Sequence, residues 1–141
     1  MERLLKLYPV SVTALAYVFL GLIGLALAIP PGYASPVFPA AGFALVVALQ
    51  AGKPALPGIW LGSLAINLIL AWSQARLTPV SALVAAGLAC GATLQAWLAG
   101  SLVARRLGTG WQRLESERDI IEFLSFGGPL ACLVSATVGV A

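Results

Sequence analysis

Long apolar runs dominate the chain, and the few charged residues stand between them. No charged residue occurs from Val10 to Ile29, from Pro54 to Ala75 or from Leu77 to Ala104. Each run can hold the roughly 20 apolar residues with which a helix crosses a bilayer. The pattern predicts an all-α protein, a polytopic transmembrane helix bundle of about five membrane segments. The expected spans are residues 8–29, 36–51, 55–72, 79–103 and 120–141.

Helix-breaking residues set the expected boundaries. The first span is closed by PPGYAS, whose prolines cannot continue a helix. The second span, which is short for a bilayer crossing, ends at GKP, and the third ends at SQARLTP. A signal peptide is the alternative for the first span, but the run from Val10 to Ile29 exceeds the apolar region of about 7–15 residues found in such peptides. We therefore expect an uncleaved first span.

Residues 105–119 form the longest hydrophilic stretch and connect the fourth and fifth spans. Trp111 and Leu114 in this stretch, and Ile121 and Leu124 after it, recur at helical spacing, which predicts an amphipathic element along the cytoplasmic interface. The fifth apolar run is still apolar at Ala141. We expect the chain to stop partway through a larger membrane unit.

Basic residues predict the orientation of the chain. With the N-terminus in the cytoplasm, seven of the eight basic residues fall on the cytoplasmic side and Arg76 falls outside. Lysine and arginine are enriched in cytoplasmic loops, so a cytoplasmic N-terminus is expected. The cytoplasmic set is Arg3, Lys6, Lys53, Arg105, Arg106, Arg113 and Arg118.

Composition argues against several kinds of function. The chain is 60% hydrophobic and 9% charged, whereas a soluble domain carries about a quarter charged residues. It has no histidine, and both cysteines, Cys90 and Cys132, lie in apolar runs, so no metal site is expected. No nucleophile–base pair or phosphate loop occurs. We expect no enzymatic activity and no cofactor, and we interpret the net charge of +3 as a topology signal rather than as a sign of nucleic-acid binding.

Small residues predict where helices pack. Gly58 and Gly62 form a GxxxG pair in the third span, which lets a second backbone approach closely. In the fourth span, Gly87, Gly91 and Gln95 follow at intervals of four, so a groove of small residues leads to an amide. These four glycines are the candidate helix-packing positions.

Uncharged polar residues predict where a ligand could bind. Trp60, Ser63 and Asn67 share a second stripe of the third span, and Gln95 lies in the fourth. At a rise of about 1.5 Å per residue, the two amides differ in depth by less than two turns and can share a pocket. Two interpretations remain open: hydrogen bonds between helices, which is the favoured one, or contact with a ligand.

The start of the second span, SPVFPAAGFAL, has a composition of its own. Pro36 and Pro39 stand where a missing N–H costs little, Ser35 can cap the helix, and Gly42 leaves room for another segment. The stretch is interpreted either as a well-terminated helix start, which is favoured, or as the rim of a sensory cavity.

Four blocks occur in order along the chain: SPVFPAAGFAL, GKPALPGIWLGSLAINL, ATLQAWLAGSLVARRL and PLACLVSATVGV. From Ser35 onward they resemble the membrane-associated sensor domain of the MASE series, first type. Members of that family usually show a W/F-P-x-x-G start, a PGIxLG…NL span and a T-L-acid/amide-A span that ends in paired arginines. Where this chain has Gln95, they often carry glutamate.

The resemblance implies a sensory role. It implies a multi-pass protein of the bacterial inner (plasma) membrane, cut short here, that binds a ligand or partner and signals to a cytoplasmic output domain of the histidine kinase (two-component) or diguanylate cyclase type. The expected partners are the lipid bilayer, that output domain and, as an open alternative, a second copy of the chain in a homodimer. The alternative functions are a small-molecule transporter, a membrane-embedded substrate-binding subunit, or a structural anchor that binds nothing.

Overall fold

A computed structural model describes residues 2–27, 38–108, 117–127, 133 and 137. Within this part of the chain, the regular elements are all helices, which confirms the all-α prediction. The elements are α1 (Glu2–Ala26), α2 (Pro39–Ala51), the short 3₁₀ helix η1 (Lys53–Ala55), α3 (Leu56–Ser73), α4 (Pro79–Leu107) and α5 (Glu117–Gly127).

Two of the described helical segments are long and apolar enough to cross a membrane, namely Lys53–Ser73 and Pro79–Arg106. The apolar parts of α1 and α2, Val10–Ala26 and Pro39–Ala51, are shorter. Most of the expected fifth span and of the amphipathic stretch 105–119 lies outside the described residues; α4 itself continues to Leu107, and α5 begins at Glu117. Among the described residues, two helical segments are thus both long and apolar enough to span a membrane, whereas the apolar runs predicted about five spans.

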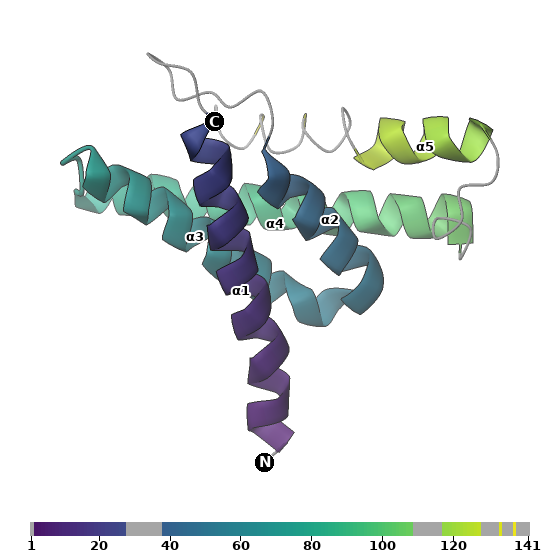
Figure 1. Cartoon of the computed structure of the whole chain (residues 1–141), viewed down its shortest axis with the longest axis horizontal. Helices are drawn as coiled ribbons and strands as arrows, with labels where there is room; N and C mark the ends of the chain where they lie inside the picture. Colours follow the sequence, from purple (N-terminus) through teal and green to yellow (C-terminus); the bar gives the residue numbers. More distant parts are fainter. Residues whose placement is uncertain (1, 28–37, 109–116, 128–132, 134–136, 138–141) are drawn as a thin grey trace.

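Figure 1 shows α3 and α4 side by side along the longest axis, with α1 crossing them and α5 beside the later part of α4. The contact between α1 and α3 advances in the same direction along both helices: Gly58 lies against Thr13, Gly62 against Tyr17, and Ile66 against Gly21. These two helices therefore run parallel over three successive turns.

The contact between α2 and α4 is also parallel. Ala41 lines cavities together with Gln95, Leu45 packs with Ala99, and Ala48 lies against Gly100. Small residues make this contact close, because a Cβ added at Gly100 would stand 3.3 Å from that of Ala48. The α3–α4 contact is antiparallel, because Trp60 contacts Cys90 whereas Gln74 shares a cavity with Ser81, nearer the start of α4. Together with the two parallel contacts, this means that consecutive helices from α1 to α4 run in opposite directions.

The interior of the bundle is built mainly from small and branched apolar residues of α1 to α4. The outward faces are also apolar: Leu15 is 71% exposed, Phe19 65% and Leu83 75%. In the most apolar stretches of the two long helices, only 33% and 28% of the residues are buried. Exposed apolar surface on this scale is unlike that of a soluble monomer and fits contact with lipid or with other protein.

Candidate functional site

A cavity of about 360 Å³ lies among the first four helices and contains most of the polar side chains singled out in the sequence. Its polar lining residues are Tyr17 of α1, Ser63 and Asn67 of α3, and Gln95 of α4. Its apolar lining residues are Leu25, Phe38, Ala41, Ile66, Leu70, Leu88 and Ala92. Its size lies within the range of roughly 300–1,000 Å³ that small-molecule sites occupy.

Hydrogen bonds fix one wall of this cavity. Ser63 and Asn67 are one turn apart on α3, and the Asn67 Nδ2 donates to the Ser63 carbonyl oxygen at 2.8 Å. The side chains of Tyr17 and Ser63 hydrogen-bond to each other across the α1–α3 contact. Both of these side chains are buried, with 3% of each exposed. The first and third helices are therefore joined by a polar contact at the cavity wall.

Gln95 forms part of the opposite wall, on α4. Together with Tyr17 it also lines a second, very small cavity of about 20 Å³ on the α2 side. Asn67 and Gln95 thus border the same cavity from neighbouring helices, so the similar depth predicted from their spacing corresponds to shared surroundings. Which of the two roles the pair has, structural contact or ligand contact, stays a prediction.

The chemistry of the cavity is polar but uncharged. Of the described residues, neither carboxylates nor basic side chains line it. The Asn67 amide has a second N–H and an oxygen beyond the bond to Ser63, so it can both donate and accept. In the described part of the chain, every buried side-chain polar atom already has a hydrogen-bond partner. A ligand here would exchange existing hydrogen bonds for its own, which suits a neutral molecule with an apolar body and a few polar groups.

Trp60 is the predicted ligand-contacting residue that the structure does not place at the cavity. Its indole Nε1 donates instead to the Cys90 Sγ at 3.3 Å, which joins α3 to α4. Ser63, Asn67 and Gln95 line the cavity together, whereas Trp60 lies one turn too far toward the start of α3. Helix α3 packs against α1 on one side and α4 on another. Trp60 therefore contacts α4, although it lies on the same predicted stripe as Ser63 and Asn67.

The packing glycines divide into two groups. A Cβ at Gly58 would stand 2.7 Å from the Thr13 Cβ, and one at Gly62 would stand 2.7 Å from the Tyr17 Cβ, so both glycines meet α1 at very short range. Gly91 is buried. Gly87 is exposed, and a Cβ there would meet no atom within 4 Å. The expected small-residue groove on α4 therefore does not extend to Gly87, because that turn of the helix faces outward.

The start of α2 differs from the prediction at Gly42, which was expected to leave room for another segment. Pro39 begins the helix after Phe38, as the tolerance for proline in a first turn allows, while Pro36 and Ser35 lie outside the described residues. Gly42 is exposed with no atom within 4 Å of an added Cβ, so no described segment approaches it. The glycine in that position faces away from the bundle.

Sequence reasoning missed two lining residues, Tyr17 and Phe38. Tyr17 stands in an otherwise apolar stretch, and a buried tyrosine hydroxyl usually needs a hydrogen-bond partner, which was the available signal. Phe38 belongs to the F-P-x-x-G start of the second span, for which a cavity rim was one interpretation, but the residue itself was not singled out. Its ring reaches the cavity because α2 docks on α1, where a ring carbon lies 2.7 Å from a Cβ placed at Gly24.

No group of three or more metal-ligating side chains occurs within the residues that the structure describes. Comparisons of the chain with family models, with curated proteins and with solved structures gave no match.

Proposed function

We propose that the chain is an integral membrane input domain that binds a small neutral ligand and signals to a cytoplasmic output domain. The observation that carries the proposal is the uncharged polar cavity at Tyr17, Ser63, Asn67 and Gln95, enclosed by helices whose outward faces are apolar. The order of the four sequence blocks that resemble the membrane-associated sensor family supports the sensory role.

Several features support the membrane placement. Two helices reach spanning length, and the alternating directions of α1 to α4 are those of a chain that passes back and forth across a bilayer. The expected fifth crossing rests on the apolar sequence from residue 120 to 141, which begins within α5. This arrangement supports a multi-pass membrane protein, and the resemblance to the sensor family is the reason for proposing the bacterial inner membrane.

The distribution of basic residues supports a cytoplasmic N-terminus. Lys53 and Ala104 line the same cavity of about 250 Å³, so Lys53 lies at the end of the bundle where α4 carries Arg105 and Arg106. Arg76 follows α3 at its other end. Because positive charge gathers on the cytoplasmic side, the end that contains Lys53 is assigned to the cytoplasm.

Signalling would require that the ligand bind one arrangement of the helices more tightly than another. The cavity borders four helices, so a bound molecule contacts both the parallel pair α1–α3 and the parallel pair α2–α4. A shift between these pairs is a direct way to change the position of the cytoplasmic end of α4.

The test is a screen for neutral molecules that raise the melting temperature of the purified chain in detergent. A ligand at one hundred times its Kd should stabilise the folded state by about 2.7 kcal/mol. Asn67→Leu and Gln95→Leu should abolish the stabilisation, because each leaves the ligand's polar groups unpaired. Thr93→Val is the matched control, since Thr93 loses only a bond to the Ala89 carbonyl in its own helix.

Three outcomes separate the competing functions. A change in the activity of an attached kinase or cyclase domain on ligand addition would support the input role. Uptake of the same compound into vesicles that contain the chain would instead favour the transporter. If the two leucine variants respond to the ligand like Thr93→Val, the cavity is not the binding site.

A further inference from the structure

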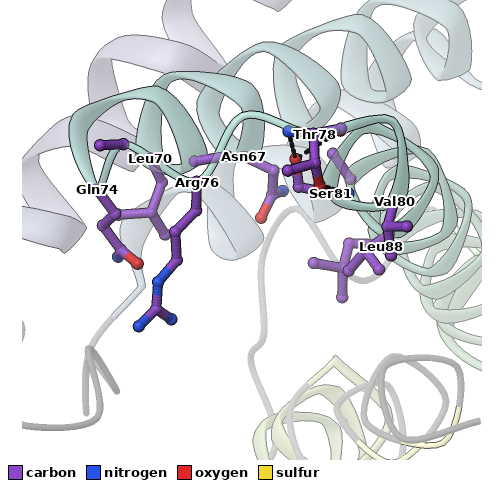
Figure 2. A pocket seen from close by; sticks show the side chains of 12 residues that line it. Asn67, Leu70, Gln74, Arg76, Thr78, Val80, Ser81 and Leu88 are labelled. Atoms are coloured by element: carbon purple, nitrogen blue, oxygen red, sulfur yellow. Dashed lines mark hydrogen bonds between the residues drawn. The ribbon is translucent and has the colours of Figure 1, made fainter.

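A larger cavity, of about 560 Å³, lies between α3 and α4 beside their connecting turn, and it adjoins the proposed ligand site. Its inner part is apolar and is lined by residues that include Leu70, Val84 and Leu88. Its rim carries Gln74 and Arg76, whose side chains extend toward the same space in Figure 2. The cavity therefore combines an apolar interior with one basic group at its mouth.

Among the described residues, no acidic side chain forms an ion pair with Arg76. Arg76 is exposed, and no acidic residue stands between Glu2 and Glu115 in the sequence. In the described part of the chain, the Arg76 guanidinium makes neither a hydrogen bond nor an ion pair, and the Gln74 side chain also has no partner. The Thr78 and Ser81 hydroxyls, by contrast, are used to cap α4. An unpaired guanidinium favours a phosphate group, to which it can donate two parallel hydrogen bonds.

We propose that this cavity binds one anionic phospholipid from the surrounding bilayer, with the phosphate at Arg76 and Gln74 and an acyl chain between α3 and α4. The inference rests on the membrane placement proposed above. In that placement the turn lies at the outer interface, where lipid head groups are found, and the apolar interior faces the depth of the acyl chains. A soluble phosphate would leave the apolar interior unfilled.

Asn67 marks the inner limit of the lipid site. It lines both this cavity and the central one, as do Leu70 and Leu88. An acyl chain that reaches this depth contacts the same residues as the proposed ligand. Bound lipid would therefore set the width of the gap between α3 and α4 next to the ligand site.

The experiment measures lipid retained by the full chain after extraction from membranes into a neutral detergent. Native mass spectrometry compares phosphatidylglycerol with phosphatidylcholine at equal mole fractions. We expect one phosphatidylglycerol to be retained with about fivefold preference, the scale of one exposed charge pair. Arg76→Gln should remove the preference, and Arg105→Gln, which removes an equal charge at the other end of the bundle, should leave it unchanged.

A second pair of variants tests the acyl-chain part. Val84→Trp should fill the cavity and lower the retention of both lipids, whereas Leu83→Trp, on an outward position that does not line the cavity, should not. Circular dichroism confirms that both variants are folded. Equal retention of the two lipids by the unsubstituted chain would overturn the proposal. So would a loss in Arg105→Gln as large as that in Arg76→Gln, or displacement of the lipid by soluble glycerol phosphate.

The failure of this inference can be separated from that of the proposed function. A chain that is not found in the membrane fraction would overturn both. A membrane-integral chain that is stabilised by a neutral ligand through Asn67 and Gln95 but shows no anionic lipid preference would overturn the lipid site alone.

Discussion

At Gly62, the lack of a side chain determines how closely two helices approach. The Tyr17 Cβ and the Ala14 carbonyl oxygen occupy the space that a Cβ would need, at 2.7 and 3.0 Å. The neighbouring Tyr17–Ser63 hydrogen bond depends on the same short separation between α1 and α3. One glycine therefore supports both the packing of these helices and the polar wall of the cavity.

Gly62→Ala should lower the stability of the protein by about 1–3 kcal/mol, the cost of overpacking a close contact. The obstructing atoms belong to backbone and Cβ, which cannot move without moving the helix. Gly87→Ala is the control, because its Cβ would meet nothing within 4 Å and alanine favours the helix by up to about 1 kcal/mol. Chemical unfolding in detergent measures both. A stabilised Gly62→Ala would show that α1 does not pack on this face.

At the scale of the element, the end of α3 positions the rim of the outer cavity. Ala75 adopts a left-handed conformation with φ of 53°, and Ala75 N donates to the Trp72 carbonyl while Arg76 N donates to that of Ala71. These two bonds form a Schellman motif, which usually has glycine at the left-handed position. The motif ends the helix and directs Gln74 and Arg76 to the cavity mouth (Figure 2).

Ala75→Gly should stabilise the protein by about 1 kcal/mol, because an alanine in the left-handed region has a steric cost that glycine lacks. Ala82→Gly, at an exposed position within α4, should instead destabilise by about the same amount through its effect on helix propensity. Thermal unfolding of the two variants gives the comparison. A loss of stability in both would mean that the α3–α4 turn does not hold Ala75 at positive φ.

At the scale of the whole molecule, the helix directions and the placement of charge agree with one topology. Consecutive helices from α1 to α4 alternate in direction, and the Lys53 end of α3 lies beside the Arg105 end of α4. Arg76 stands at the opposite end. The proposed topology therefore assigns the α3–α4 turn to the outside and the end of α4 to the cytoplasm.

Cysteine labelling tests this topology in a background where Cys90 and Cys132 are replaced by alanine. Ser73→Cys should react with a membrane-impermeant maleimide in intact spheroplasts, and Ala104→Cys should react only after permeabilisation. Both native residues are exposed, so access within the bundle does not limit the reaction. Labelling of Ala104→Cys alone in intact spheroplasts would reverse the orientation.

The residue pattern alone predicts the helical character of the chain and the extent of α3 and α4. Proline, glycine and charge mark the ends of α3 and α4 within a few residues, because these residue types interrupt helices or avoid the bilayer core. The spacing of Asn67 and Gln95 also indicated that the amides lie at similar depth. The structure adds that they line one cavity.

Which face of each helix meets which neighbour is known from the packed structure and not from the residue pattern. Periodicity groups residues on a face but does not orient that face, and in an apolar chain the inner and outer faces have nearly the same composition. Gly62 and Gly87 illustrate this, since each belongs to a GxxxG pair. Gly62 is nevertheless buried against α1, whereas Gly87 is exposed. Trp60 contacts Cys90 rather than the cavity, and Tyr17 and Phe38 line the cavity, because the docking of α1 and α2 on α3 and α4 places them there.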